Sequence, residues 1–301
     1  MLLALLAATP PARAHNQPPP IELWGPFLPA TQSCLRRISD ATHACFDRVF
    51  ALEQACRDAQ AGGGSCDETQ LEADLSAQDG ALRATLADAC QDGQLTELSY
   101  IGFFDAGADL NRGCLGEAQN AIAAVYAPTR NGGAVSADVA RCLSASADYA
   151  RKVLRLALQR EVPVMERIAT RLVSTEEKQA AILKVNQELS TDRTRWSAGL
   201  LAACPDFEQV YGRSPDGFLR TLKQRVDCVL SRTYVHSSVA CLPPACGNGI
   251  PEGDEACDDG NANDGDACLN DCTLGVSSRC SPSWLIRWRW SGCPTRVMRI
   301  P

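Results

Sequence analysis

The sequence contains few of the residues and motifs that most enzymes use. Its three histidines, His15, His43 and His236, lie outside any His-Glu-x-x-His motif. The chain also lacks Gly-x-Ser-x-Gly, a phosphate-binding loop, a dinucleotide-binding fingerprint and Cys-x-x-Cys. We therefore expect a non-catalytic protein. An enzyme of unidentified class stays an alternative, because two glycosidase-type acids need not be close in sequence.

Long apolar runs and basic faces are also missing. No stretch after the first residues of the chain reaches the roughly 18 consecutive apolar residues of a membrane-spanning helix. The net charge is −7, and no basic face indicates nucleic-acid binding. Aromatic residues make up only 6% of the chain. With the abundant alanine, this favours tight packing over a roomy cavity.

The N-terminus is typical of an exported protein. Leu2 to Ala8 form a short apolar run, and Ala12-Arg13-Ala14 is a small-x-small cleavage pattern. We predict a signal peptide at 1–14, although its usual basic start is missing and a frayed apolar N-terminus is the alternative. Residues 15–30 are rich in proline and predict an extended arm.

Sixteen cysteines agree with export, because an oxidising compartment turns thiols into disulfides. The expected location is extracellular, at the cell surface or in the periplasm. Ten cysteines lie between Cys34 and Cys241, four between Cys246 and Cys272, and two in the tail, Cys280 and Cys293. Each number is even, so each segment can close its own disulfides, but the full pairing is open.

The first helical pattern carries a stripe of cysteine. Cys34, Cys45 and Cys56 recur every 11 residues, which returns to nearly the same face of a helix. Gly62-Gly63-Gly64 ends this helix. A second helix is expected from about Asp67, with a capping-box-like Thr69-x-x-Glu72 and one face of leucines, namely Leu71, Leu75, Leu82 and Leu86.

The two helices predict an antiparallel hairpin. Cys56 and Cys66 flank its turn, and Cys34 and Cys90 meet at its open end. We therefore predict the disulfides Cys56–Cys66 and Cys34–Cys90.

Further helices follow, and strand patterns are nearly absent before Cys241. We expect a short apolar helix at 95–104, a helix at 108–127, and one from about Ser136 that Pro163 kinks or interrupts. Separate helices are expected at 174–189 and 193–204. Ser214-Pro215 is a suitable cap for a last helix at 217–233.

The cysteine spacing has a weak internal echo. Cys114 follows Cys90 at the same spacing as Cys228 follows Cys204. The fold class is therefore mainly α: a disulfide-stapled array of two divergent helical units, 31–130 and 136–241, followed by a small loop module. Coincidence is the alternative, because local residue matches are poor.

The segment from Cys246 to Cys272 is acidic and rich in turn residues. It holds eight acidic residues and no Lys or Arg. With so few apolar residues it needs disulfides, a metal, or both. Its hard oxygen ligands are of the type that calcium prefers, although the spacing is not that of an EF-hand. The candidate calcium ligands are Asp258, Asp259, Asn261, Asn263, Asp264 and Asp266. A solvated acidic turn without metal is the alternative.

The pattern C-G-N-G-x-x-E-x-x-E-x-C-D-D-G-N-x-x-x-G-D-x-C-x-x-x-C resembles the Myxococcus cysteine-rich repeat, a domain of unknown function in exported bacterial proteins. The resemblance covers about a tenth of the chain, and Ala267 departs from the glycine usual at its position. It includes the four cysteines that we expect to be oxidised, Cys246, Cys257, Cys268 and Cys272. We assign this module to 246–275 and an Arg- and Trp-rich tail to 276–301.

These features favour a secreted or cell-surface structural or interaction protein with a candidate calcium-binding module. Its expected partner is a protein or a component of the cell envelope, of unknown identity, with no nucleic acid and no membrane span. A helical carrier of a small hydrophobic ligand is the second hypothesis.

Overall fold

The computed structural model describes residues 25–129, 135–235, 239 and 241, and these form α-helices without any strand. The prediction of a mainly α, disulfide-stapled body is thus confirmed. The helices are α1 (Pro29–Ala61), α2 (Glu68–Ala89), α3 (Asp92–Glu97), α4 (Phe103–Asn111), α5 (Glu117–Val125), α6 (Ala137–Thr170), α7 (Thr175–Ala203), α8 (Phe207–Tyr211) and α9 (Pro215–Thr233). A π-helical turn, η2 (Arg112–Gly116), joins α4 to α5, and a 3-10 turn, η3 (Ala127–Thr129), follows α5.

Several helix ends follow from their capping residues. The side chains of Ser136 and Ser214 accept hydrogen bonds from the backbone at the starts of α6 and α9, as their positions predict. Asp67, rather than the expected Thr69 and Glu72, caps α2 by accepting from the Gln70 amide at 2.9 Å. The predicted proline-rich arm at 15–30 overlaps the start of α1, because Pro29 occupies the first turn of this helix.

The expected helix at 95–104 is wrong, because a turn divides this stretch between α3 and α4. Ser99 adopts a left-handed backbone conformation with φ of 71°. The turn brings Tyr100 into the core, where its hydroxyl donates to the carbonyl of Arg232 at 2.7 Å. Burial of the Tyr100 ring and the hydrogen bond of its hydroxyl thus take the place of the backbone hydrogen bonds that a continuous helix would form here.

Pro163, expected to kink or interrupt its helix, does not interrupt it, and the expected break between 189 and 193 is absent. α6 continues through Pro163 to Thr170, and Val164, Met165 and Ile168 beyond the proline are buried. α7 is continuous where two helices were expected. Asp192, at the expected break in α7, forms an ion pair with Arg160 of α6 at 3.1 Å.

Five disulfides join the ten cysteines between Cys34 and Cys241. Both predicted pairs are confirmed: Cys34–Cys90 and Cys56–Cys66. The other three pairs are Cys45–Cys114, Cys142–Cys204 and Cys228–Cys241. The cysteine stripe of α1 therefore connects this helix to three separate segments.

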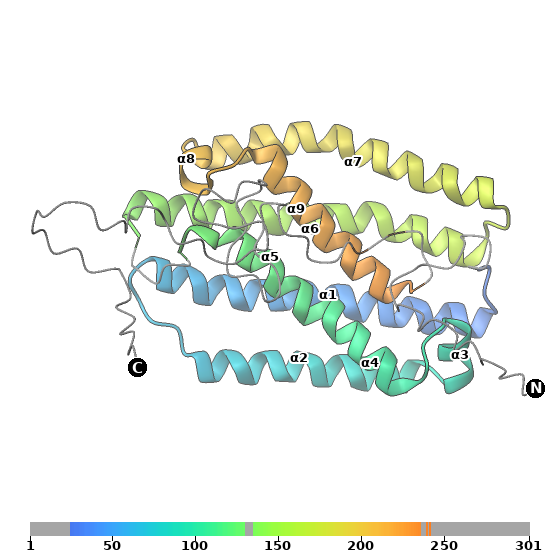
Figure 1. The fold of residues 1–301 in the computed structure, drawn as a ribbon. Coiled ribbons are helices and arrows are strands. Elements are labelled where there is room, and N and C mark those ends of the chain that lie inside the picture. Colours follow the sequence, from blue (N-terminus) through green and yellow to red (C-terminus); the bar gives the residue numbers. More distant parts are fainter. Residues whose placement is uncertain (1–24, 130–134, 236–238, 240, 242–301) are drawn as a thin grey trace, which may run out of the picture. The chain divides into compact units, whose positions relative to one another are not determined.

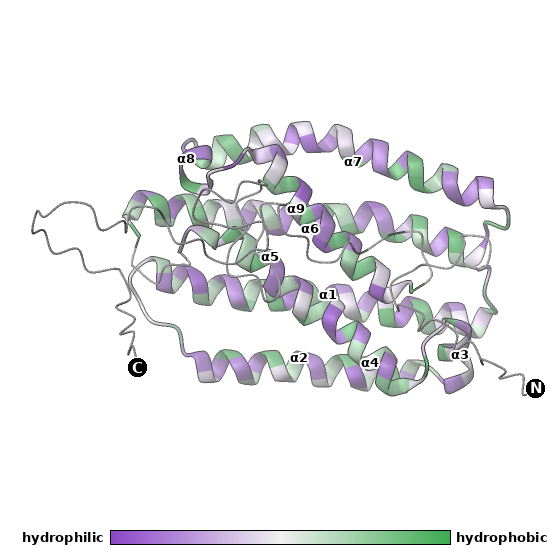
Figure 2. Cartoon of the chain, viewed as in Figure 1, coloured by the Kyte–Doolittle hydropathy of each residue, from purple (hydrophilic) through white to green (hydrophobic). Residues whose placement is uncertain are grey.

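The two long central helices, α1 and α6, lie side by side and run in opposite directions (Figure 1). α2 packs on α1, α7 packs on α6, and α5 and α9 pack together across the central pair. Few side chains of α2 and α7 are buried, whereas α1 and α6 each bury a long stripe. Figure 2 accordingly shows hydrophilic residues along much of the two outer helices.

The two predicted units share one core and are not separate bodies, because buried residues of α1, α5, α6 and α9 form a continuous cluster. They nevertheless have the same order: a long helix, a second long helix, a short helix, and a crossing helix. Cys34–Cys90 and Cys142–Cys204 occupy corresponding places in the two units. Related helices also meet each other, α1 with α6 and α5 with α9. This arrangement favours two divergent copies related by an approximate two-fold rotation, as in a symmetric dimer.

None of the described helices combines the length and the apolar character that are needed to cross a bilayer. The predicted segments 1–14, 246–275 and 276–301 lie outside the described residues.

Breaking the corresponding disulfides should destabilise the body by similar amounts. Cys34–Cys90 and Cys142–Cys204 have sequence separations of 56 and 62 residues, against 10 for Cys56–Cys66. Loop-closure entropy predicts a loss of about 4 kcal/mol for either long loop and about 3 kcal/mol for the short one. Urea unfolding of the three paired Cys→Ser variants measures these losses. A larger loss for Cys56→Ser/Cys66→Ser than for either long-loop variant would contradict this account.

Candidate functional site

The site residues predicted from the sequence and the pocket found in the structure belong to different parts of the chain. The candidate calcium ligands from Asp258 to Asp266 lie outside the described residues, as do Cys246, Cys257, Cys268 and Cys272. Within the described part, Glu117, Cys228 and Cys241 come close enough to suggest a metal site. Cys228 and Cys241 are joined as a disulfide, so they offer no thiolate to a metal.

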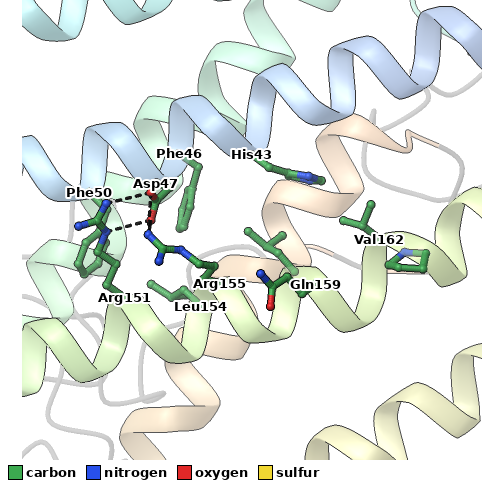
Figure 3. A pocket seen from close by; sticks show the side chains of 11 residues that line it. His43, Phe46, Asp47, Phe50, Arg151, Leu154, Arg155, Gln159 and Val162 are labelled. Carbon is green, nitrogen blue, oxygen red and sulfur yellow. Dashed lines mark hydrogen bonds and ion pairs between the residues drawn. The ribbon is translucent and has the colours of Figure 1, made fainter.

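A pocket of about 340 Å³ lies between α1 and α6. Figure 3 shows its charged side chains gathered around Asp47, with His43 and Val162 farther along the helices. Apolar side chains form most of the wall between them. The lining residues are His43, Phe46, Asp47, Phe50, Arg151, Leu154, Arg155, Leu158, Gln159, Val162 and Pro163.

Two arginines of α6 hold Asp47 of α1. Arg151 donates from Nε and Nη2 to the two carboxylate oxygens, each at 2.9 Å. Nη2 of Arg155 donates to the same oxygens at 2.8 and 2.9 Å. Partial burial raises the pKa of Asp47, but hydrogen bonds from both arginines outweigh this effect and bring it below its usual value. Asp47 is therefore ionised at neutral pH, and two cations share one anion.

His43 adds a neutral polar group to the pocket. Its Nε2 atom is buried and has no hydrogen-bond partner among the described residues. Burial lowers the pKa of His43 to about 4, because the charged imidazolium loses its hydration. The residue as a whole retains some exposure, so the burial concerns the inner edge of the ring.

The pocket is built from corresponding positions of the two units. Matching Cys34 with Cys142 sets an offset of 108 positions. This offset matches His43 with Arg151, Phe46 with Leu154, Asp47 with Arg155, and Phe50 with Leu158, and all eight residues line the pocket. The site was not predicted from the sequence. A signal was present, because the offset of the predicted repeat pairs an acid, Asp47, with a base, Arg155.

A second polar cluster lies between α6 and α9. Lys223 Nζ contacts Glu161 Oε1 at 2.6 Å and also forms an ion pair with Asp227. The other carboxylate oxygen of Glu161, Oε2, is buried, and no residue in the described part of the chain forms a hydrogen bond with it. Burial raises the pKa of Glu161 to about 7, although Lys223 opposes this shift. Lys223 and Asp227 border a smaller cavity of about 280 Å³ that Trp196 also lines.

The comparisons with known proteins leave the family open. No family model and no solved structure matches the chain. A curated rat protein (Rattus norvegicus), disintegrin and metalloproteinase domain-containing protein 1, is 44% identical over 70 residues. That match covers 23% of this chain and 9% of the relative's length. The resemblance to the Myxococcus cysteine-rich repeat stays a prediction.

Glu161 should make the stability of the body depend on pH. Its pKa is about 7 in the folded protein, against an ordinary value of 4.5. The folded state therefore binds more protons between these values, and the contribution of Glu161 to stability falls as pH rises through this window, by on the order of 2–3 kcal/mol. His43, whose pKa is lowered from 6.5 to about 4, contributes in the opposite direction over nearly the same pH range, so the two effects largely cancel in the parent protein. Urea unfolding from pH 4 to 8 should therefore show a steeper rise of stability with pH in Glu161→Gln than in the parent.

His43→Asn provides a control of opposite sign. The pKa of His43 is about 4 in the folded protein, against an ordinary value of 6.5, so its contribution is lost as pH falls from 6.5 through 4. His43→Asn removes this opposing contribution, so its stability should fall more steeply than that of the parent as pH rises from 4.5 to about 7. Equal slopes in the parent and Glu161→Gln would contradict the assignment of Glu161.

Proposed function

We propose that the chain is a secreted or cell-surface structural or interaction protein without catalytic activity, whose stapled helical body carries the acidic cysteine-rich module. The observation that supports this proposal most is the set of five disulfides across the body. Such cross-links suit a scaffold that has to keep its shape outside the cell.

The chemistry of the cysteines supports the non-catalytic part of this proposal. The ten cysteines between Cys34 and Cys241 are consumed in disulfides and are not free to act as thiolate nucleophiles. The same pairing supports an oxidising compartment. We infer export to the extracellular space, the cell surface or the periplasm, with a protein or cell-envelope component as partner.

We further propose that the acidic module binds calcium. The six candidate ligands fall within nine positions, and the four aspartates among them repel one another once a disulfide frame holds them together. A divalent cation would relieve that repulsion and contribute to folding of a segment with little apolar core.

Calorimetric titration of the full chain with calcium tests this part. We expect saturable heat at or below millimolar calcium, and a melting temperature that falls on chelation. Asp258→Asn/Asp259→Asn should abolish both effects. Asp92→Asn/Asp206→Asn, a matched change at two exposed residues of the body, should preserve both. No heat at millimolar calcium together with no effect of a chelator would refute calcium binding.

A second candidate function is the carriage of a small hydrophobic ligand. The α1–α6 pocket favours it, because about 340 Å³ is within the roughly 300–1,000 Å³ range of small-molecule sites. The low aromatic content of the sequence favours tight packing over a roomy cavity, which argues against a carrier. Two of its few aromatic residues, Phe46 and Phe50, nevertheless line the pocket.

Native mass spectrometry of the protein purified from its own host tests the carrier function. A bound small molecule should be present in the parent protein and lost in Val162→Trp, whose larger side chain fills the pocket. Leu183→Trp, an enlargement of an exposed residue on α7, should retain the ligand. Retention in Val162→Trp would contradict binding in this pocket.

A further inference from the structure

We propose that the α1–α6 pocket binds a small single-chain amphiphile with a carboxylate headgroup. The headgroup lies on Arg155, and the chain runs past Phe46 and Leu158 toward Val162. This inference rests on the carrier function above and specifies the chemical class of its ligand.

The charge balance of the pocket selects an anion. Its lining contains two guanidinium groups, one carboxylate and one histidine, and the histidine is neutral at neutral pH. Asp148 also acts electrostatically on Arg151, so the least compensated charge is that of Arg155, which shares the Asp47 carboxylate with Arg151. A ligand carboxylate would balance it, whereas a cationic headgroup would add to it.

Of the two arginines, Arg155 is the one that is available to bind a ligand headgroup. Only its Nη2 atom contacts Asp47, and its Nε and Nη1 have no hydrogen-bond partner among the described residues. Its side chain is 52% exposed, against 33% for Arg151. The Nη1 group of Arg155 can give a charge-assisted hydrogen bond to a ligand carboxylate. The exposure allows the headgroup to reach Arg155 from solvent.

The remaining wall suits one short apolar chain. Phe46 of α1, and Leu158 about one turn beyond Arg155 on α6, present apolar surface between the charged end and Val162. Helical rise places Arg155 and Val162 roughly 10 Å apart along α6. This length fits decanoate, and the pocket volume, at the lower end of the range for ligand sites, favours one chain over two.

Sequence differences between the two units give the pocket one charged end and one apolar end. Asp47 and His43 of α1 correspond to Arg155 and Arg151 of α6, so both cations come from the second unit. The apolar pairs Phe46 with Leu154 and Phe50 with Leu158 keep their character. The charged end is thus where the two copies differ, while their apolar contacts are shared.

Isothermal titration of the full chain with decanoate, decanol and decyltrimethylammonium tests the proposal. We expect decanoate to bind at least tenfold more tightly than the other two probes. Arg155→Gln should weaken decanoate about tenfold, because a charge-assisted hydrogen bond is lost, and should leave decanol unchanged. Asp47→Asn should strengthen decanoate by removing the competing carboxylate.

Arg160→Gln is the matched control. It makes the same change on the same helix, but Arg160 pairs with Glu188 and Asp192 of α7, outside the pocket. Its decanoate affinity should equal that of the parent. Circular dichroism of each variant checks that the helices are intact.

The outcomes separate this inference from the carrier function. If decanoate and decanol bind equally and Arg155→Gln weakens neither, the anionic headgroup is refuted while the carrier function stands. If none of the three probes binds, both are refuted. Decanoate binding that survives Val162→Trp would place the ligand elsewhere and overturn the assignment to this pocket.

Discussion

The cysteine stripe of α1 is the constraint on which the rest of the body depends. Cys34, Cys45 and Cys56 lie on one face of a single helix and bond to three different segments. These bonds fix α1 relative to α2 and to the turn that leads into α5. With α1 so placed, α6 packs along it, and the pocket between the two helices acquires one rigid wall. Cross-links of this kind act mainly by restricting the unfolded chain.

Local patterns predicted the elements whose geometry they determine by themselves. The 11-residue cysteine spacing, the triple glycine and the leucine positions were sufficient for the α1–α2 hairpin and its two disulfides. The predicted interruption at Pro163 is absent, because buried residues on both sides of it hold α6 together although a proline removes a backbone hydrogen bond. The alternative of a kink stays a prediction. The stretch at 95–104 misled the prediction because Tyr100 gains a buried contact with the end of α9 by leaving the helix. Tertiary packing decided both cases, and neither packing partner is close in sequence.

The pocket shows the same limit at the level of function. Asp47 by itself is one of many helical acids in the sequence, and its two arginine partners are more than a hundred residues away. The repeat offset connects them, but only a structure shows that the matched helices lie against each other. The acidic module is the reverse case. Its spacing in the sequence is specific, and the described residues provide no geometry for it.

Mass spectrometry of the unreduced, protease-digested protein tests the central claim most directly, since the helical packing and the pocket both depend on the disulfide pattern. The account predicts linked peptides for Cys34–Cys90, Cys45–Cys114, Cys56–Cys66, Cys142–Cys204 and Cys228–Cys241. A bond between Cys34 and Cys45, or one that joins Cys34 to Cys142, would contradict it.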